Sequence, residues 1–244
     1  MNTTYLKKIK LKEDKIEDMD KYPFNLPVIK NLDKLEFNTP VTFIVGENGS
    51  GKSTLIEAIA VAMGLNPEGG NKAVNFNSEK THSNLYKYLR CVKGHKYPKE
   101  WFFLRAETFY NVATYYQGDG ILDVDYSGTF GLRSIHKSSH GELFLAALEN
   151  KLHGNGFYIF DEPEAALSPT RQLNALIEID RLAQDSQLII ATHSPILMSY
   201  PGATIYEISN GEFKKVNYYE TEHYKVTKDF LCHTDVMLRE LLKD

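Results

Sequence analysis

One stretch near residue 40 constrains the fold more than any other part of the chain. Residues 41–45 read Val-Thr-Phe-Ile-Val, a β-branched and aromatic run that suits a buried strand. Residues 46–54, Gly-Glu-Asn-Gly-Ser-Gly-Lys-Ser-Thr, fit the pattern G-x-x-x-x-G-K-[ST], and residues 55–63 read as a helix with an apolar face. A strand, a glycine-rich loop and a helix in this order form the setting that a phosphate-binding loop requires.

The residue types in the loop explain how it would bind phosphate. Gly46, Gly49 and Gly51 let the backbone approach an anion closely, and the loop N–H groups converge where the helix dipole favours negative charge. We expect Lys52 to reach the β- and γ-phosphates and Ser53 to offer its hydroxyl to Mg²⁺. The other expected nucleotide-binding residues are Asn48, Ser50 and Thr54. The alternative, a glycine turn that only joins a strand to a helix, does not require this spacing, so the pattern predicts a nucleoside triphosphate site.

Composition narrows the class of protein. The chain has 244 residues, 42% of them hydrophobic and 25% charged, with a net charge of -4, which is ordinary for a soluble globular protein of one large or two small domains. The mild acidity argues against an overall attraction to nucleic acid, although a local basic face stays open. Two cysteines, Cys91 and Cys232, are too few for a zinc site or a disulfide framework, so we expect a reducing, cytoplasmic location. We find neither a signal peptide nor an apolar run of about 18 residues that would span a membrane.

Strand and helix patterns alternate along the chain. This predicts an α/β P-loop fold with a largely parallel core sheet, an antiparallel N-terminal β part and a small helical insertion. We expect residues 5–11 to form an edge strand and residues 83–92 a helix. Residues 1–244 are expected to form a single domain whose insertion covers about residues 78–140. Further strands are expected at 101–106, 157–160 and 187–191, helices at 141–153, 169–184, 225–231 and 235–243, and a hairpin at 204–218.

A second functional motif closes the predicted strand at 157–160. Four apolar residues are followed by Asp161 and Glu162, which is the Walker B pattern. Asp161 is expected to hold Mg²⁺, and Glu162 to orient or deprotonate the attacking water. A buried strand that ends in two acids is a weak signal alone, but it is a strong one behind a phosphate loop.

Two further motifs fit an anion site. His193, in Ala-Thr-His-Ser-Pro after the strand at 187–191, is placed to donate to a γ-phosphate and to sense its loss. Ser139 and Gly141, in Ser-His-Gly-Glu at the start of a predicted helix, offer a hydroxyl and N–H groups. The alternative for this second motif is an ordinary helix N-cap with a glutamate in the first turn.

Together and in this order, the motifs resemble the ATP-binding-cassette (ABC) ATPase family, and the resemblance covers nearly the whole chain. The most similar group is that of small stand-alone bacterial predicted ATPases, sometimes classed as AAA-family or ABC-like, with the Ser-His-Gly-Glu signature. The segments that carry the resemblance are residues 22–24, 46–54, 103–107, 139–142, 161–169, 191–195 and 221–224.

The resemblance implies a head-to-tail homodimer with two ATP molecules and Mg²⁺ at the interface. Ser139 and Gly141 would act in trans, on the γ-phosphate held by the partner's Lys52. Glu162 would be the catalytic carboxylate, and His193 the γ-phosphate switch.

The adenine contact is also implied by the resemblance. Tyr22 would stack on the base, with its neighbour Phe24 as the alternative.

Three positions depart from the pattern of ABC transporters. The signature is Ser-His-Gly-Glu instead of Leu-Ser-Gly-Gly-Gln. Glu107, which stands where transporters place a glutamine, is a candidate Mg²⁺ ligand, and Ser168 replaces an expected aspartate.

The sequence therefore predicts a Mg²⁺-dependent ATPase whose nucleotide-driven dimerisation switches another process. By analogy with related soluble ATPases, that process is nucleic-acid maintenance or defence, with a nucleic acid or a separate protein as partner. The alternatives are the nucleotide-binding subunit of an ABC transporter and a nucleotide-dependent binding module that does not hydrolyse ATP.

Overall fold

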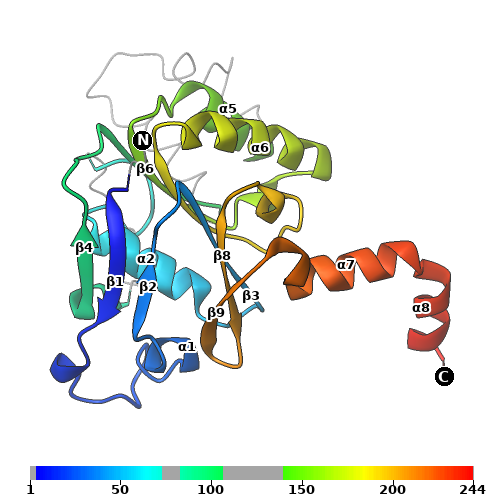
Figure 1. The fold of residues 1–244 in the computed structure, drawn as a ribbon, viewed down its shortest axis with the longest axis horizontal. Coiled ribbons are helices and arrows are strands. Elements are labelled where there is room, and N and C mark those ends of the chain that lie inside the picture. The colour runs from blue at the N-terminus through cyan, green and yellow to red at the C-terminus, as the bar shows by residue number, and fades with distance from the viewer. Residues whose placement is uncertain (1–3, 73–82, 107–139, 244) are drawn as a thin grey trace.

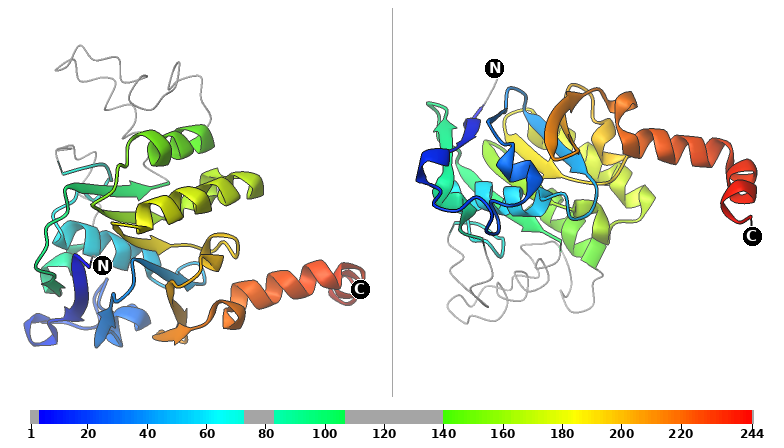
Figure 2. Two further views of the ribbon diagram at one scale, coloured as in Figure 1. Left: turned by 45° about the horizontal axis from the view of Figure 1, so that its top comes forward. Right: turned by 90° about the horizontal axis from the view of Figure 1, so that it is seen from below.

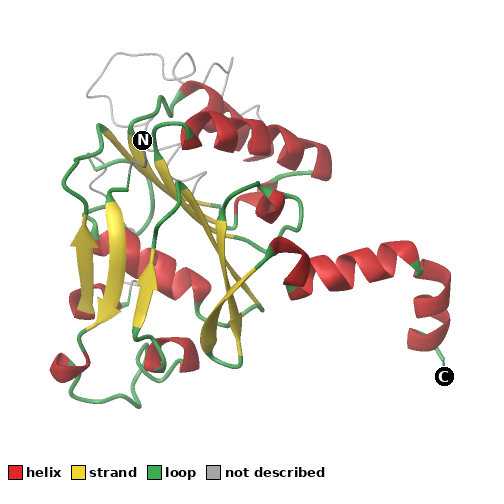
Figure 3. Ribbon diagram, viewed as in Figure 1, coloured by secondary structure: helices red, strands yellow, loops and turns green. Residues whose placement is uncertain are grey.

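A computed structural model describes residues 4–72, 83–106 and 140–243. Strands and helices alternate along the chain. The strands form two sheets, and helices pack beside them (Figures 1 and 3). Glu107, Ser139 and most of the expected insertion lie outside the described residues. Short 3-10 turns occur at Glu13–Lys15, Asn84–Tyr88, Pro163–Ala166, Leu197–Ser199 and Tyr218–Glu220.

The larger sheet has six strands. Their order is β5 (Glu100–Arg105), β6 (Gly156–Asp161), β7 (Gln187–Ala191), β3 (Val41–Gly46), β8 (Thr204–Ser209) and β9 (Glu212–Val216). The first five strands run parallel, and only β9 is antiparallel, to β8. Asn210 and Gly211 join these last two strands with φ of 53° and 75°, the conformation that a tight hairpin turn needs. The predicted α/β fold with a largely parallel core sheet is confirmed.

Helices cover both faces of this sheet (Figure 2). The core on one face includes α5 (His140–Asn150) and α6 (Pro169–Ala183), and the core on the other includes α2 (Lys52–Ala62). Side chains alternate between the two cores along a single strand: Tyr158 and Phe160 pack with α5 and α6, whereas Phe157 and Ile159 pack with α2. Burial on both faces explains why these strands are apolar throughout.

The smaller sheet is antiparallel and has the order β2 (Lys34–Glu36), β1 (Leu6–Leu11) and β4 (Leu89–Lys93). It packs on the side of α2 away from the larger sheet (Figure 1), and α1 (Pro27–Lys30) lies beneath it. Buried Gln187 at the start of β7 links the two sheets: its Oε1 accepts from the N–H groups of Tyr5 and Leu6, and its Nε2 donates to Leu6 O, each at 2.8 Å. The expected antiparallel N-terminal part is confirmed.

Residues 83–92 were expected to be helical, and this prediction is wrong. Leu85 and Leu89 have helical spacing and both are buried, but after the turn at Asn84–Tyr88 the chain becomes strand β4. Cys91 and Leu89 pair with Ile9 and Leu11 of β1, so pairing along an available strand edge overrides the local pattern. As a result β1 is the central strand of its sheet, whereas an edge strand was expected.

Residues 89–105, which lie within the expected subregion at about 78–140, supply β4 to the smaller sheet and β5 to the larger one. Strand β5 is the strand expected at 101–106.

The C-terminal helices differ from the rest. Helices α7 (Glu222–Cys232) and α8 (Thr234–Leu241) extend away from the sheets and contain no buried residue (Figure 1). Within the described residues, no helix is both long and apolar enough to cross a membrane.

Candidate nucleotide site

The register of the larger sheet brings the sequence motifs together. Asp161 at the end of β6 lies level with Ala191 of β7 and Arg105 of β5, and Ala191 is level with Ile44 of β3. The loops that follow these strands therefore leave the sheet at one edge. Ligands of parallel α/β sheets bind at such carboxyl ends.

The loop after β3 leads directly into α2. Gly51, the N-cap of the helix, has a φ of 96°, and a Cβ at this position would meet Val28 Cγ1 at 2.6 Å. Gly49 has a φ of 77° with open space around a would-be Cβ. Glycine is required at both positions for its backbone conformation, and at Gly51 also for close packing. The N-terminus of an 11-residue helix then faces the loop, which suits an anion.

Lys52 is folded over this loop. Its Nζ donates to the carbonyl oxygens of Gly46 at 2.8 Å and Glu47 at 2.9 Å, and the residue is only 3% exposed. Burial lowers the pKa of Lys52, while the carboxylates of Glu162 and Asp161 oppose that shift. The loop thus holds a buried amine at the start of the helix, where a phosphate would meet it.

Ser53 and Asp161 form the candidate Mg²⁺ site. Ser53 Oγ donates to Asp161 Oδ1 at 3.1 Å, and Arg105 Nε lies 3.6 Å from Asp161 Oδ2. Arg105 also pairs with Glu57 of α2 at 3.0 Å, so the guanidinium is fixed between two carboxylates. Among the described residues there is no cluster of three or more His, Cys, Asp or Glu for a metal. Two oxygen ligands nevertheless fit Mg²⁺, which keeps several waters and takes its remaining ligands from phosphates.

Glu162 and His193 face each other across the site. His193 Nε2 lies 3.4 Å from Glu162 Oε1, and this buried nitrogen has no hydrogen-bond partner among the described residues. Burial lowers the pKa of His193, and the positive charge of Lys52 lowers it further. The negative charge of Glu162 opposes this shift. The imidazole is therefore neutral near neutral pH, with one N–H to donate.

Three further residues support these groups, and sequence reasoning gave them no role. Glu164 accepts a short hydrogen bond from the His193 N–H, Arg105 holds Asp161, and the ring of His223 in α7 contacts His193. All three lie in segments that carry the family resemblance, at residues 103–107, 161–169 and 221–224, but their contacts join residues far apart in the sequence, so no local pattern gave their roles.

Two cavities meet at the site. One of about 310 Å³ is lined by the loop together with Tyr22, Leu26 and Glu162. The other, of about 280 Å³, is lined by Ser53, Arg105, Ala106, Asp161, Glu162, Ala165 and Ala166. Ser53 and Glu162 border both cavities, so the two cavities adjoin beside the candidate Mg²⁺ ligand and the Walker B glutamate.

Of the two aromatic residues considered for the base, only Tyr22 is accessible. Tyr22 is 62% exposed, and its hydroxyl lies 3.3 Å from Thr54 Oγ1. Phe24 is 5% exposed and packs edge-on against Tyr88, with ring centroids 4.9 Å apart, so it cannot stack on a base.

Gly141 in the first turn of α5 has a packing role. It is buried, and a Cβ there would meet Ala166 O at 2.4 Å and Arg171 Nη1 at 2.9 Å. Ser168, where an aspartate was expected, is the exposed N-cap of α6.

Comparison with known proteins agrees with this geometry. A family model described as an AAA domain matches residues 6–119, and a second, described as "AAA domain, putative AbiEii toxin, Type IV TA system", matches residues 143–199. No curated protein is similar enough in sequence to match the chain.

Solved structures match over almost the full length. An ATP-binding cassette of an ABC transporter in its ADP conformation is 17% identical and covers 98% of this chain and 99% of its own, with a TM-score of 0.52. The cbiO1 protein of Clostridium perfringens, part of the ABC transporter complex cbiONQ, is 18% identical over 96% and 97% of the two chains, with a TM-score of 0.50. This chain has the fold of an ABC-type P-loop ATPase domain.

A third structural match is an SMC head domain from Thermotoga maritima. It is 18% identical over 87% of this chain and 98% of its own, with a TM-score of 0.47. The range that the first family model matches includes the phosphate loop, and the range that the second matches includes Asp161, Glu162 and His193.

Proposed function

We propose that this ABC-type domain is a Mg²⁺-dependent ATPase that dimerises on binding ATP and separates after hydrolysis. The observation that supports it best is the convergence of four groups at one edge of the sheet. These are the loop amine of Lys52, the Ser53–Asp161 pair, Glu162 and the neutral His193.

Binding rests on the loop and the cavity beside it. The loop N–H groups and Lys52 take the phosphates, and Tyr22 stacks on the adenine at the exposed end of the 310 Å³ cavity. Ser53 and Asp161 would hold Mg²⁺, which supplies charge neutralisation for the phosphate oxygens when bound. Arg105 keeps the Asp161 carboxylate in place for this role.

Hydrolysis uses the other side of the site. Glu162, which is partly exposed, accepts a proton from a water that attacks the γ-phosphorus, and the bond between that phosphorus and the ADP oxygen breaks. The Nε2–H of His193 donates to the γ-phosphate in place of its contact with Glu162. The products are ADP and inorganic phosphate.

Dimerisation follows from the family resemblance and from chemistry. In this proposal Ser139, which precedes α5 in the sequence, contacts the γ-phosphate bound by a second copy. Gly141 takes part only through its backbone, because its Cα side is packed against Ala166 and Arg171. A ligand can shift assembly only if it binds the assembled state better, and a phosphate shared by two subunits meets this condition. Loss of the γ-phosphate removes the shared contact.

The test compares wild type with Glu162→Gln and Lys52→Ala. Wild type should release phosphate only with Mg²⁺. Glu162→Gln should lose turnover by roughly 10²–10⁴-fold, the range for general-base removal, yet still bind ATP. Lys52→Ala serves as the binding control and should bind ATP poorly. Light scattering should show Glu162→Gln at 27.8 kDa without nucleotide and at twice that mass with Mg-ATP.

The outcomes separate the possibilities. Tight ATP binding by wild type without phosphate release would overturn the ATPase proposal in favour of a binding module. Turnover with an unchanged mass in Glu162→Gln would overturn the dimer switch and keep the ATPase.

A further inference from the structure

The first turn of α7 contacts the nucleotide site through one residue. His223 Nε2 lies 3.1 Å from His193 Nδ1, and the two ring centroids are 5.2 Å apart at an interplanar angle of 55°. The other nitrogen of His193, Nε2, faces Glu162 at 3.4 Å. Glu162, His193 and His223 therefore form a row that leads from the site to the root of the C-terminal helices.

The position of His223 is fixed by the body of the protein. Thr221, the N-cap of α7, is fully buried, accepts from Tyr224 N at 3.4 Å and donates to Tyr218 O at 2.8 Å. Glu222 N donates to Glu207 Oε1 of β8 at 2.8 Å. These bonds anchor the helix at the residues on either side of His223, so its ring is held against His193 although the rest of α7 is exposed.

The groups nearest the two ring nitrogens of His193 favour one tautomer: the Glu162 carboxylate faces Nε2 as a charged neighbour at 3.4 Å, and His223 is hydrogen-bonded to Nδ1. A carboxylate can only accept, so Glu162 favours a proton on Nε2 of His193. In a neutral ring Nδ1 is then an acceptor, and the 3.1 Å contact requires a donor on Nε2 of His223. The opposite tautomer of His193 would turn an acceptor toward Glu162 and toward any γ-phosphate oxygen.

We propose that His223 is a positioning residue that keeps His193 in the tautomer and orientation needed to donate to the γ-phosphate. The proposal rests on the ATPase function proposed above. It assigns a task in the reaction cycle to the Thr-Glu-His-Tyr segment at residues 221–224. His223 acts through His193 and does not itself touch the nucleotide.

Ring packing alone does not explain the contact. A nitrogen–nitrogen separation of 3.1 Å is a hydrogen-bond distance, and the rings are tilted instead of stacked. The two explanations predict different results for two substitutions. His223→Phe keeps a ring of similar shape but has no donor, whereas His223→Gln loses the ring but carries an amide N–H near the place of Nε2.

The first test reads the tautomer directly and needs no nucleotide. Two-bond ¹H–¹⁵N spectra of histidine-labelled protein distinguish protonated from unprotonated ring nitrogens, and His193→Gln assigns the relevant signals among eight histidines. We expect His193 to be protonated on Nε2 in wild type and in His223→Gln, and to become a mixture of tautomers in His223→Phe. A wild-type proton on Nδ1, or no change in His223→Phe, would overturn the proposal.

The second test separates kcat from KM. Loss of a residue that orients a functional histidine typically costs ten- to a hundred-fold, so His223→Phe should lower kcat by about tenfold and leave KM for ATP nearly unchanged. His223→Gln should recover most of that loss. His233→Ala is the matched control: His233 lies between α7 and α8, its side chain contacts Asp229 of α7, and the variant should turn over ATP like wild type.

Failure of this inference can be told apart from failure of the ATPase proposal. If wild type does not hydrolyse ATP, the proposed function is wrong, and the tautomer measurement still decides the role of His223. If wild type is active and His223→Phe matches it in kcat, or if His223→Gln is as impaired as His223→Phe, donation by His223 is not needed and this inference is wrong.

Discussion

The backbone of Glu162 adopts a conformation that residues other than glycine rarely adopt. Its φ and ψ are 51° and 53°, in the left-handed region, and its N–H donates to Ala191 O at 2.9 Å. For a residue with a Cβ this region costs about 1–2 kcal/mol. The turn directs the Glu162 carboxylate toward His193 and both cavities, so the cost falls on a residue with a proposed catalytic role.

We expect Glu162→Gly to be more stable than Glu162→Ala, although both lack the carboxylate and neither should hydrolyse ATP. Glycine adopts the left-handed conformation without strain. It also makes the unfolded chain more flexible, which lowers the free energy of unfolding by about 0.5–1 kcal/mol. The net difference of roughly 0.5–1 kcal/mol corresponds to about 1–4 °C in Tm for a chain of this size. A Tm of Glu162→Gly that lies below that of Glu162→Ala by the entropic cost of glycine would show that Glu162 is not strained in solution.

Glu164 is a largely buried carboxyl in the same turn. Burial raises its pKa above the ordinary value of 4.5, and the charge of Glu162 adds to the shift, although the N–H of His193 donates to it. A group whose pKa is raised in the folded state stabilises the protein fully only when the pH is below the pKa of that group in the unfolded chain. This stabilisation is lost as the pH rises through the pKa of the folded state. Glu164 therefore destabilises the fold once it is ionised.

The prediction for Glu164→Gln is a pH-dependent gain in stability. Glutamine still accepts the bond from His193 N–H but carries no charge, so its Tm should exceed that of wild type by more at about pH 8 than at about pH 5. Thermal melts at both pH values measure the difference. Glu149→Gln, at an exposed position near the end of α5, is the control and should track wild type at both. A larger gain at the lower pH would contradict the assignment.

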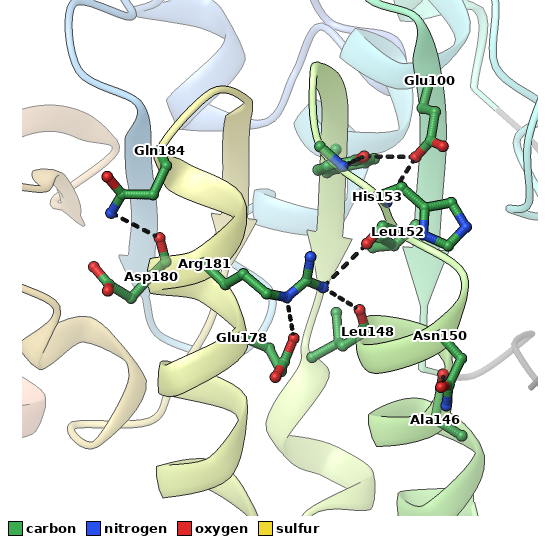
Figure 4. A network of polar contacts seen from close by, with 12 residues as sticks. Glu100, Ala146, Leu148, Asn150, Leu152, His153, Glu178, Asp180, Arg181 and Gln184 are labelled. Carbon is green, nitrogen blue, oxygen red and sulfur yellow. Dashed lines mark hydrogen bonds and ion pairs between the residues drawn. The ribbon is translucent and has the colours of Figure 1, made fainter. Parts of the chain in front are cut away.

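At the scale of elements, Arg181 joins α6 to the end of α5 on one face of the larger sheet (Figure 4). Arg181 of α6 donates through Nη2 to the carbonyl oxygens of Leu148 at 2.8 Å and Leu152 at 3.0 Å, at and just beyond the end of α5, and through Nε to Glu178. The last carbonyls of a helix lack partners within it, so a cation placed there satisfies them and opposes the helix dipole. Because α5 leads into β6, this bond also holds the segment before Asp161.

Arg181→Met should keep the apolar stem of the side chain and lose these bonds. Hydrogen bonds to a charged group contribute about 1.5–3 kcal/mol, so we expect the free energy of unfolding in urea to fall by that amount. Arg239→Met is the matched control, since the Arg239 side chain in the exposed helix α8 donates to the Asp235 carbonyl of its own helix, and the variant should change stability by less than about 0.5 kcal/mol. Equal losses in both variants would mean that Arg181 does not secure α5.

The same scale shows what local patterns could predict. The core strands of the larger sheet were predicted because burial on both faces makes them continuously apolar, and the hairpin because Asn210 and Gly211 suit its turn. Residues 83–92 were predicted wrongly because Leu85 and Leu89 fit a helix locally, while the pairing of β4 with β1 depends on residues 80 positions away. A sequence pattern therefore indicates which residues of a segment are buried, but it does not indicate which distant strand the segment pairs with.

At the scale of the whole molecule, the fold and the position of the site followed from the order of motifs. Parallel strands place their carboxyl ends at one edge, so Lys52, Asp161 and His193 could be expected there together. The supports of these groups could not be predicted, because Arg105 and His223 reach them from β5 and α7 through tertiary contacts alone. The choice of Tyr22 over Phe24 likewise needed their exposure.

The C-terminal helices divide into an anchored root and an exposed tip. Thr221 is fully buried at the root, whereas Leu231, Leu241 and Leu242 are 70%, 69% and 74% exposed. Stability comes mainly from apolar burial, and neither α7 nor α8 contains a buried residue. The tip therefore contributes an apolar surface and little to the stability of the body.

Removal of residues 234–244 should leave the Tm within about 2 °C of that of the full chain. In contrast, Thr221→Val at the root should lower the free energy of unfolding by about 1 kcal/mol, because the N-cap of α7 is lost, and should disturb the position of His223. Melts over a range of protein concentrations are needed, because association through the exposed leucines would make the Tm of the full chain depend on concentration. A concentration-independent fall of several degrees on truncation would show that α8 packs against the body in solution. A fall seen only at high concentration would show that α8 is covered by a second copy.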